Sequence, residues 1–159
     1  MAAKNYSREL SDAISTFLND DDWNFSFDDS RGIFKFNLSI KGKLKKVNYI
    51  VDVKEKDFIT YAISPLGGDT DDPRQMARLA EFVCRANFGL KNGCFEFDFS
   101  DGEIRYKSFV DCEDINPSTE VIKNSIYVSA VMMERYGNGI VDIIYGDADP
   151  AEAVEECER

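Results

Sequence analysis

The chain has 159 residues, of which 43% are hydrophobic and 13% aromatic, so a single folded domain with a sizeable core is expected. Acidic residues number 30 and basic residues 19, which gives a net charge of −11, and histidine is absent from the sequence. This balance lacks the basic surface that proteins use against nucleic acid, and it disfavours anionic membranes. Without histidine, a Ser-His-Asp triad, a Cys-His dyad and a histidine-ligated zinc site are excluded.

The sequence favours a cytoplasmic location. No apolar stretch follows Lys4, as a secretory signal would require. The apolar runs are far shorter than the roughly 20 residues that span a bilayer. No pair of cysteines has the CxxC spacing of a zinc or redox site, and Cys84 and Cys94 are expected to be small, reduced residues of the core.

The first part of the chain predicts a helix followed by four strands. Apolar residues recur at helical spacing over residues 5–19, and alternating patterns then predict strands over residues 23–28, 34–40 and 47–53. A fourth strand is expected over residues 58–64, with apolar residues on both of its faces. The lysine-rich turn at residues 41–46 is expected to be solvated, with contact to an acidic partner or to the protein's own acidic tail as the alternative.

The middle of the chain predicts an amphipathic helix over residues 73–88, with Pro73 in its first turn and Gly89 at its end. Its apolar arc covers roughly 200°, which is wider than the roughly 100° needed to pack on one sheet. We therefore expect burial on two sides, one against the sheet and the other against either a second subunit or the last helix. The candidate dimer or partner surface comprises Met76, Leu79, Phe82, Val83 and Phe88. Asn87 lies in the same arc, and we expect its amide to bond to the turn at Gly89.

A hairpin follows the middle helix. Phe95, Phe97 and Phe99 alternate with acidic residues, and Asp101-Gly102 is typical of a two-residue turn. Such a turn predicts a register that pairs Phe99 with Ile104, Asp98 with Arg105, Phe97 with Tyr106 and Glu96 with Lys107. One face of the hairpin would then be apolar, and the other would carry two pairs of opposite charge.

A long helix is expected from Asn116-Pro117 to about Tyr145, with Gly137 and Gly139 as places where it could bend. Residues 147–159 contain six acids and one arginine, and they predict an acidic tail that frays or forms a short helix. The chain is thus divided into one domain over residues 1–146 and an acidic C-terminal tail over residues 147–159. The order helix, four strands, helix, two strands, helix predicts an α+β fold with an antiparallel sheet.

Glu96 with Asp98 is one candidate pair for acid–base chemistry, but both are expected to pair with basic residues across the hairpin. The other candidates for metal or acid–base chemistry are clusters of carboxylates, and each lies at a turn or a helix start, where aspartate is common for structural reasons. They are Asp20 to Asp22, Asp28 with Asp29, Asp69 with Asp71 and Asp72, and Asp111 with Glu113 and Asp114. None follows the spacing of an EF-hand loop. We therefore assign no catalytic, cofactor-binding or metal-ligating residue and expect no cofactor.

One segment resembles a known family. It comprises Arg85-Ala86-Asn87, Gly93-Cys94-Phe95-Glu96-Phe97-Asp98 and Asp101-Gly102-Glu103-Ile104-Arg105-Tyr106. These residues resemble the YbjN family, whose members are described as bacterial sensory transduction regulators. The order of elements is also similar to the fold of type III secretion chaperones, which are small, acidic, cytoplasmic homodimers that hold an unfolded segment of an effector.

The resemblance implies a non-enzymatic binding module, chaperone-like or regulatory, that forms a homodimer and docks a segment of another protein. Two other functions stay open at this point. One is a metal-dependent enzyme that uses the carboxylate clusters. The other is a small-molecule sensor with a pocket between sheet and helix.

Overall fold

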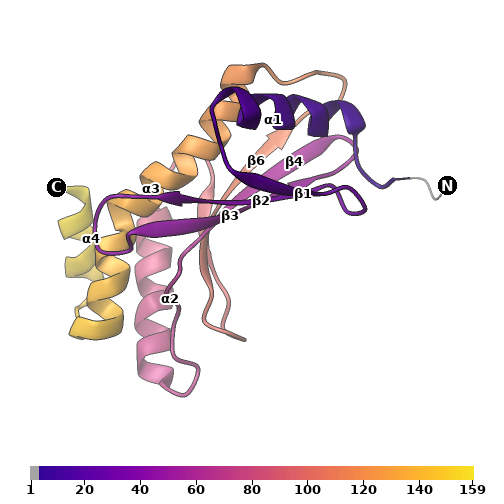
Figure 1. Ribbon diagram of the computed structural model, residues 1–159. Helices are drawn as coiled ribbons and strands as arrows, with labels where there is room; N and C mark the ends of the chain where they lie inside the picture. The colour runs from indigo at the N-terminus through magenta and orange to yellow at the C-terminus, as the bar shows by residue number, and fades with distance from the viewer. Residues whose placement is uncertain (1–3) are drawn as a thin grey trace.

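A computed structural model describes residues 4–159, and it shows an α+β fold built from one antiparallel sheet and a layer of helices (Figure 1). The predicted order of helix, four strands, helix, two strands, helix is confirmed, and a further helix follows. In chain order the elements are α1 (Arg8–Asp20), β1 (Phe25–Asp28), β2 (Ile33–Ser39), β3 (Lys46–Val53), β4 (Asp57–Ile63), α2 (Pro73–Asn87), β5 (Cys94–Phe97), β6 (Ile104–Asp111), α3 (Thr119–Gly146) and α4 (Pro150–Glu158). Over residues 4–159, no helix is both long and apolar enough to cross a bilayer.

The sheet has the strand order β1-β2-β3-β4-β6-β5, so that the short strands β1 and β5 form its two edges. Alternation along the strands buries one face under the helices and leaves the other face without a helical cover. The covered face is rich in aromatic and branched residues, which include Phe34, Tyr49, Val51, Phe58, Phe95, Ile104 and Tyr106. Because only this face is buried by helices, the core lies between the sheet and the helical layer.

The long helix α3 crosses the covered face, and Tyr49 at the centre of the sheet ties the two layers together. Its hydroxyl donates to the carbonyl oxygen of Ile126 at 2.6 Å. Burial of this side chain raises the pKa of Tyr49 well above its usual value, so the hydroxyl keeps its proton and remains a donor. Trp23, which follows α1, packs edge-on against both Tyr49 and Tyr127 of α3.

Helix α3 runs without a break through Gly137 and Gly139, where the sequence left a bend open. A Cβ atom at Gly139 would lie 2.5 Å from the ring of Phe82 on α2, and one at Gly137 would lie 2.7 Å from the side chain of Leu44. The two glycines therefore serve close packing, because they let α2 and the turn between β2 and β3 approach the axis of α3.

The lysine-rich turn between β2 and β3 contacts acidic and amide side chains of α3. The backbone N–H of Lys41 donates to Glu134 at 2.9 Å, and that of Lys43 donates to Asn138 at 2.8 Å. The ammonium group of Lys43 also pairs with Asp142. The four lysine side chains of this turn are exposed, as expected for a solvated turn, and the acidic residues that it contacts belong to α3 rather than to the acidic tail.

The acidic C-terminal segment forms the short helix that was one of its two predicted states. Asp149 caps this helix, α4, by accepting from the backbone N–H groups of Ala151 and Glu152. Ala153 and Val154 are buried, and the hydroxyl of Tyr136 on α3 donates to Glu158 at 2.7 Å. Helix α4 packs on both α2 and α3, so this segment belongs to the helical layer rather than fraying from it (Figure 1).

The predicted register of the last hairpin is wrong by two residues. In the structure Phe97 opposes Ile104, Phe95 opposes Tyr106 and Glu96 opposes Arg105. The connection is longer than the predicted two-residue turn, because the N–H of Asp98 donates to the carbonyl of Glu103 and the N–H of Gly102 donates back to Asp98. Phe99 consequently lies in the loop, where it is exposed, instead of pairing with Ile104.

Candidate functional site

Most of the partner surface predicted on α2 is buried in the structure, and one of its residues is exposed. Helix α2 packs against β5, α3 and α4 of its own chain, which corresponds to the within-chain alternative for its second side. This packing buries four of the five candidate residues: Met76, Leu79, Phe82 and Val83. Phe88, at the C-terminal end of the helix, is 91% exposed and is the one candidate residue left at the surface.

The wide apolar arc expected on α2 is not present as a buried surface. Ala77, Cys84 and Phe88, which the sequence placed in the apolar arc, are all exposed. The buried residues Met76, Leu79, Phe82, Val83 and Ala86 form one stripe of ordinary width. The expectation that Cys84 is a core residue is therefore wrong, because Cys84 lies outside this buried stripe.

Asn87 contacts a different partner from the one expected. Its side-chain amide donates to the carbonyl of Phe95 at 2.9 Å and accepts from the N–H of the same residue at 2.6 Å. These are the peptide groups that β5 points away from β6, so the amide takes the place of a neighbouring strand at this edge of the sheet. Asn87 thereby joins the end of α2 to β5 and blocks the centre of a free strand edge.

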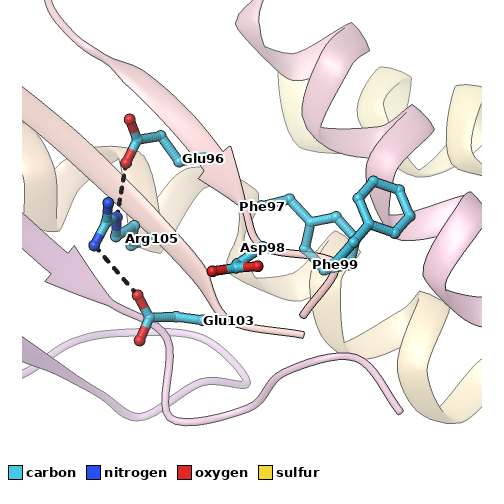
Figure 2. Close-up of a pocket in the computed structure, with 6 residues that line it drawn as sticks. All are labelled: Glu96, Phe97, Asp98, Phe99, Glu103 and Arg105. Carbon is cyan, nitrogen blue, oxygen red and sulfur yellow. Dashed lines mark hydrogen bonds and ion pairs between the residues drawn. The ribbon is translucent and has the colours of Figure 1, made fainter. Parts of the chain in front are cut away.

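A pocket lies at the tip of the β5–β6 hairpin and is lined by both charged and aromatic residues (Figure 2). Glu96 accepts from Arg105 at 2.7 Å and also pairs with Lys107, and Arg105 lies 4.1 Å from the centre of the Tyr61 ring. Burial raises the pKa of Glu96, but the hydrogen bonds from Lys107 and Arg105 outweigh it and hold that pKa below its usual value. The charges here are paired with one another, which makes this cluster a means of joining two strands.

The face of the sheet away from the helices carries a belt of large apolar side chains that the sequence analysis did not propose as a site. We call it the open-face belt, and it comprises Ile50, Ile59, Tyr61, Ile63 and Phe109. The strand register places Ile50 beside Tyr61 and Ile59 beside Phe109, so the belt is continuous across β3, β4 and β6. Phe109 is 55% exposed, and the other four residues are half-buried by their neighbours on the sheet.

Charged residues lie on the same face both beside this belt and at its two ends. The strand register places Asp52 beside Ile59, Lys107 beside Tyr61 and Arg105 beside Ile63. Asp57 and Asp111 face each other across β4 and β6, and like charges in directly opposed positions destabilise a sheet. Lys46 lies at the start of β3, which is the opposite end of the face because β3 and β4 run antiparallel. Within residues 4–159, neither these two aspartates nor Lys46 takes part in an ion pair.

One sequence signal did point to this belt. The strand predicted over residues 58–64 has apolar residues on both of its faces, and only one face can be turned toward the helices. The structure turns Phe58 and Ala62 inward and leaves Ile59, Tyr61 and Ile63 on the open face. An apolar outer face on a central strand is therefore the pattern from which the site could have been predicted.

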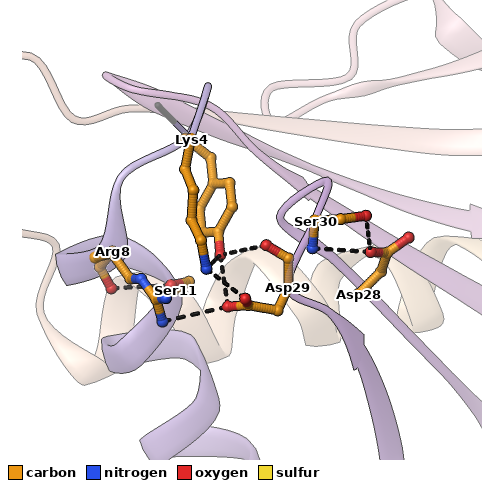
Figure 3. A network of polar contacts seen from close by, with 7 residues as sticks. Lys4, Arg8, Ser11, Asp28, Asp29 and Ser30 are labelled. Carbon is orange, nitrogen blue, oxygen red and sulfur yellow. Dashed lines mark hydrogen bonds and ion pairs between the residues drawn. The ribbon is translucent and has the colours of Figure 1, made fainter. Parts of the chain in front are cut away.

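The carboxylate clusters hold turns and helix ends, as the structural interpretation expected. Asp28 accepts from both the N–H and the hydroxyl of Ser30, and Asp29 accepts from Tyr6 and pairs with Lys4 (Figure 3). The hydrogen bonds from Lys4 and then Tyr6 hold the pKa of Asp29 below its usual value. In the part of the chain that the structure describes, no group of three or more carboxylates or thiolates is arranged to hold a metal ion.

Comparison with known proteins yields no match to this chain, either among protein-family models or among curated protein sequences. The resemblance to the YbjN family and to type III secretion chaperones accordingly stays a prediction from the residues quoted above.

Proposed function

We propose that this protein is a non-enzymatic binding module, chaperone-like or regulatory, that acts as a homodimer and docks a segment of a partner protein in the bacterial cytoplasm. The observation that carries the proposal is the open-face belt, a continuous apolar surface on three central strands with no helix over it. Contiguous apolar surface of this kind is typical of protein–protein contact sites. The occupant that we assign to it is a second copy of the same chain.

The size of the face supports a dimer contact. Strands lie about 4.8 Å apart and rise about 3.3 Å per residue, so a six-stranded sheet with strands of about seven residues measures roughly 25 Å in each direction. Two such faces in contact would remove roughly 1,200 Å² from water, which is the lower end of the range for stable protein–protein interfaces. The belt would form the dry centre of this contact and the charged ends its polar rim.

The charges favour one arrangement of the two copies. A two-fold axis that runs across the strands, between the two sheets, reverses the strand direction of the partner. The end that carries Asp57 and Asp111 then lies over the end of the partner that carries Lys46. The contact thus gives these aspartates a cation that residues 4–159 of their own chain do not supply, and the same contact occurs twice by symmetry.

The experiment that tests this proposal is sedimentation equilibrium of the wild type and of Phe109→Lys. Phe109 is the most exposed residue of the belt, so the substitution leaves the fold intact while it places a charge within the proposed contact. We expect a wild-type dimer and a dissociation constant raised at least about tenfold in the variant, as for a large apolar residue of an interface. Phe99→Lys is the matched control, because Phe99 is 63% exposed and lies in the hairpin loop rather than on the belt.

Two results would contradict the proposal. One is a wild-type chain that stays monomeric at concentrations of about 100 μM, since a contact of this size that is that weak would not hold a dimer in a cell. The other is equal dissociation of Phe109→Lys and Phe99→Lys, which would mean that the dimer does not use the open-face belt.

A further inference from the structure

We infer that a groove between α2 and α4 takes a short segment of a partner protein that carries a large apolar side chain next to lysine or arginine. The inference rests on the proposed role as a binding module, but it concerns a surface on the opposite side of the molecule from the open-face belt. It gives a function to two features that the fold leaves unexplained, namely the exposed Phe88 and the acidic outer face of α4.

The groove is built from the ends of two helices that lie side by side (Figure 1). Its lining residues are Cys84, Arg85 and Phe88 of α2 together with Ala151, Val154, Glu155 and Glu158 of α4. Its volume is about 460 Å³, which is within the range of sites that hold several side chains. Val154 is buried and forms an apolar floor, while Phe88 stands at the rim with nearly all of its ring in water.

An aromatic ring this exposed is unusual on a helix whose other large apolar residues are buried. The backbone of Phe88 is held at the end of α2, because its N–H donates to the carbonyl of Arg85 at 3.2 Å. A leucine, methionine or aromatic side chain placed in the groove would cover the Phe88 ring on one side and Val154 on the other. Aromatic residues held in this way are the usual anchors of protein interfaces.

The charge of the groove indicates which residues should lie next to the apolar side chain in the bound partner segment. The guanidinium of Arg85 is already paired with Glu81 at 2.8 Å, so it does not neutralise the opposite wall. That wall carries Glu155 and Glu158, and although Arg159 pairs with Glu155 and Glu156, the four glutamates of α4 outnumber this one arginine, so the wall stays acidic. A partner with lysine or arginine next to its apolar anchor would complement this surface, whereas an acidic partner would be repelled.

The inference is tested by panning the intact protein against a displayed library of random twelve-residue peptides. We expect enriched peptides that share a large apolar residue next to lysine or arginine. Binding of the synthetic peptides should weaken at least tenfold in Phe88→Ala and stay unchanged in Phe99→Ala, which removes another exposed aromatic ring elsewhere. Bound peptide should also slow the alkylation of Cys84, an exposed free thiol in the groove.

A charge exchange makes the test specific for the acidic wall. Glu155 is exposed, so Glu155→Lys should preserve the fold while it abolishes binding of the basic peptides. Peptides in which glutamate replaces the basic residues should bind this variant better than they bind the wild type.

The inference is overturned if no peptide is enriched, if the enriched peptides lack a basic residue, or if they bind Phe88→Ala as tightly as the wild type. It is also overturned if raising the protein concentration alone protects Cys84, because a second copy would then occupy the groove. Failure of the dimer proposal is recognised separately, by the sedimentation of Phe109→Lys.

Discussion

The two faces of the sheet differ both in what covers them and in how apolar they are. The face under the helices holds Phe34, Tyr49, Phe58 and Tyr106, each almost completely buried. The open face holds the five residues of the open-face belt among charged side chains such as Asp52, Arg105 and Lys107, with carboxylates at one end and Lys46 at the other. The covered face explains why the chain folds, and the open face is what remains for a partner.

Helix α2 is the opposite case, because its apolar surface was expected to bind a partner and is instead covered by the same chain. Its apolar stripe predicted a partner surface, but the chain itself supplies α3, α4 and β5 as partners for that stripe. The difference between α2 and the open face teaches that periodicity gives the direction of an apolar surface but not the identity of what covers it. The predictions below separate covered surfaces from uncovered ones.

The largest expected effect is that of a charge on the buried stripe of α2. Leu79 has no exposed surface, so Leu79→Glu places an unpaired carboxylate in the core. We expect a loss of at least about 4 kcal/mol in the free energy of unfolding, measured by urea denaturation. Ala77→Glu on the exposed side of the same helix is the matched control, with an expected change within about 0.5 kcal/mol. A folded, monomeric Leu79→Glu protein would show instead that this stripe belongs to an interface.

A smaller effect is expected where the end of α2 meets the edge of the sheet. Asn87→Ala removes both hydrogen bonds to Phe95 and leaves two peptide groups of the edge strand without a partner. The expected loss is about 1–3 kcal/mol, and the amide of Phe95 should exchange with solvent faster than in the wild type. Asn24→Ala, at an exposed position before β1, serves as the control. Unaltered protection of the Phe95 amide would refute the role of Asn87 as an edge cap.

The smallest effect concerns the ion pairs on the open side of the hairpin. The pKa of Glu96 lies below its usual value of 4.5, so the folded state favours the carboxylate and gains stability from it above pH 4.5. This contribution falls away as the pH drops below 4.5 and passes through the pKa of the folded state. Glu96→Gln does not titrate, so its free energy of unfolding should approach that of the wild type between pH 7 and pH 3. The difference at pH 7 should be below about 1 kcal/mol, because the pair is partly solvated. A difference that is constant over this range would contradict the assigned cause.

The order of elements could be predicted from the sequence because local signals determine it. Alternation set the strands, and Asp72 with Pro73 marks the start of α2 in the structure as it does in the sequence. The hairpin register could not be predicted in the same way. A shift of two residues keeps every side chain on its own face, so the pattern of Phe95, Phe97, Glu96 and Asp98 fits both registers equally well. In the structure the longer loop contacts a distant segment, because the N–H of Gly68 donates to the carbonyl of Gly102 at 2.9 Å, and alternation along the strands does not reveal such a contact.

The candidate site was only partly predictable, for a related reason. The apolar residues on both sides of the strand at residues 58–64 were visible in the sequence, but which side the helices would cover depended on contacts between distant elements. Phe88 was named as a partner residue, and it is the one member of that set that the structure leaves exposed. Its groove could not be predicted, because half of it comes from α4, and the sequence did not indicate that this short helix would pack beside α2.

The central claim is that a second copy covers the open face with its strands reversed, and a charge exchange measured by sedimentation equilibrium tests it most directly. Lys46 and Asp57 lie at opposite ends of the face within one chain, so they can approach each other only between copies. Lys46→Glu and Asp57→Lys should each weaken the dimer about tenfold, and the double variant should recover most of the wild-type affinity. A double variant that dissociates as much as the two single effects combined would contradict the claim.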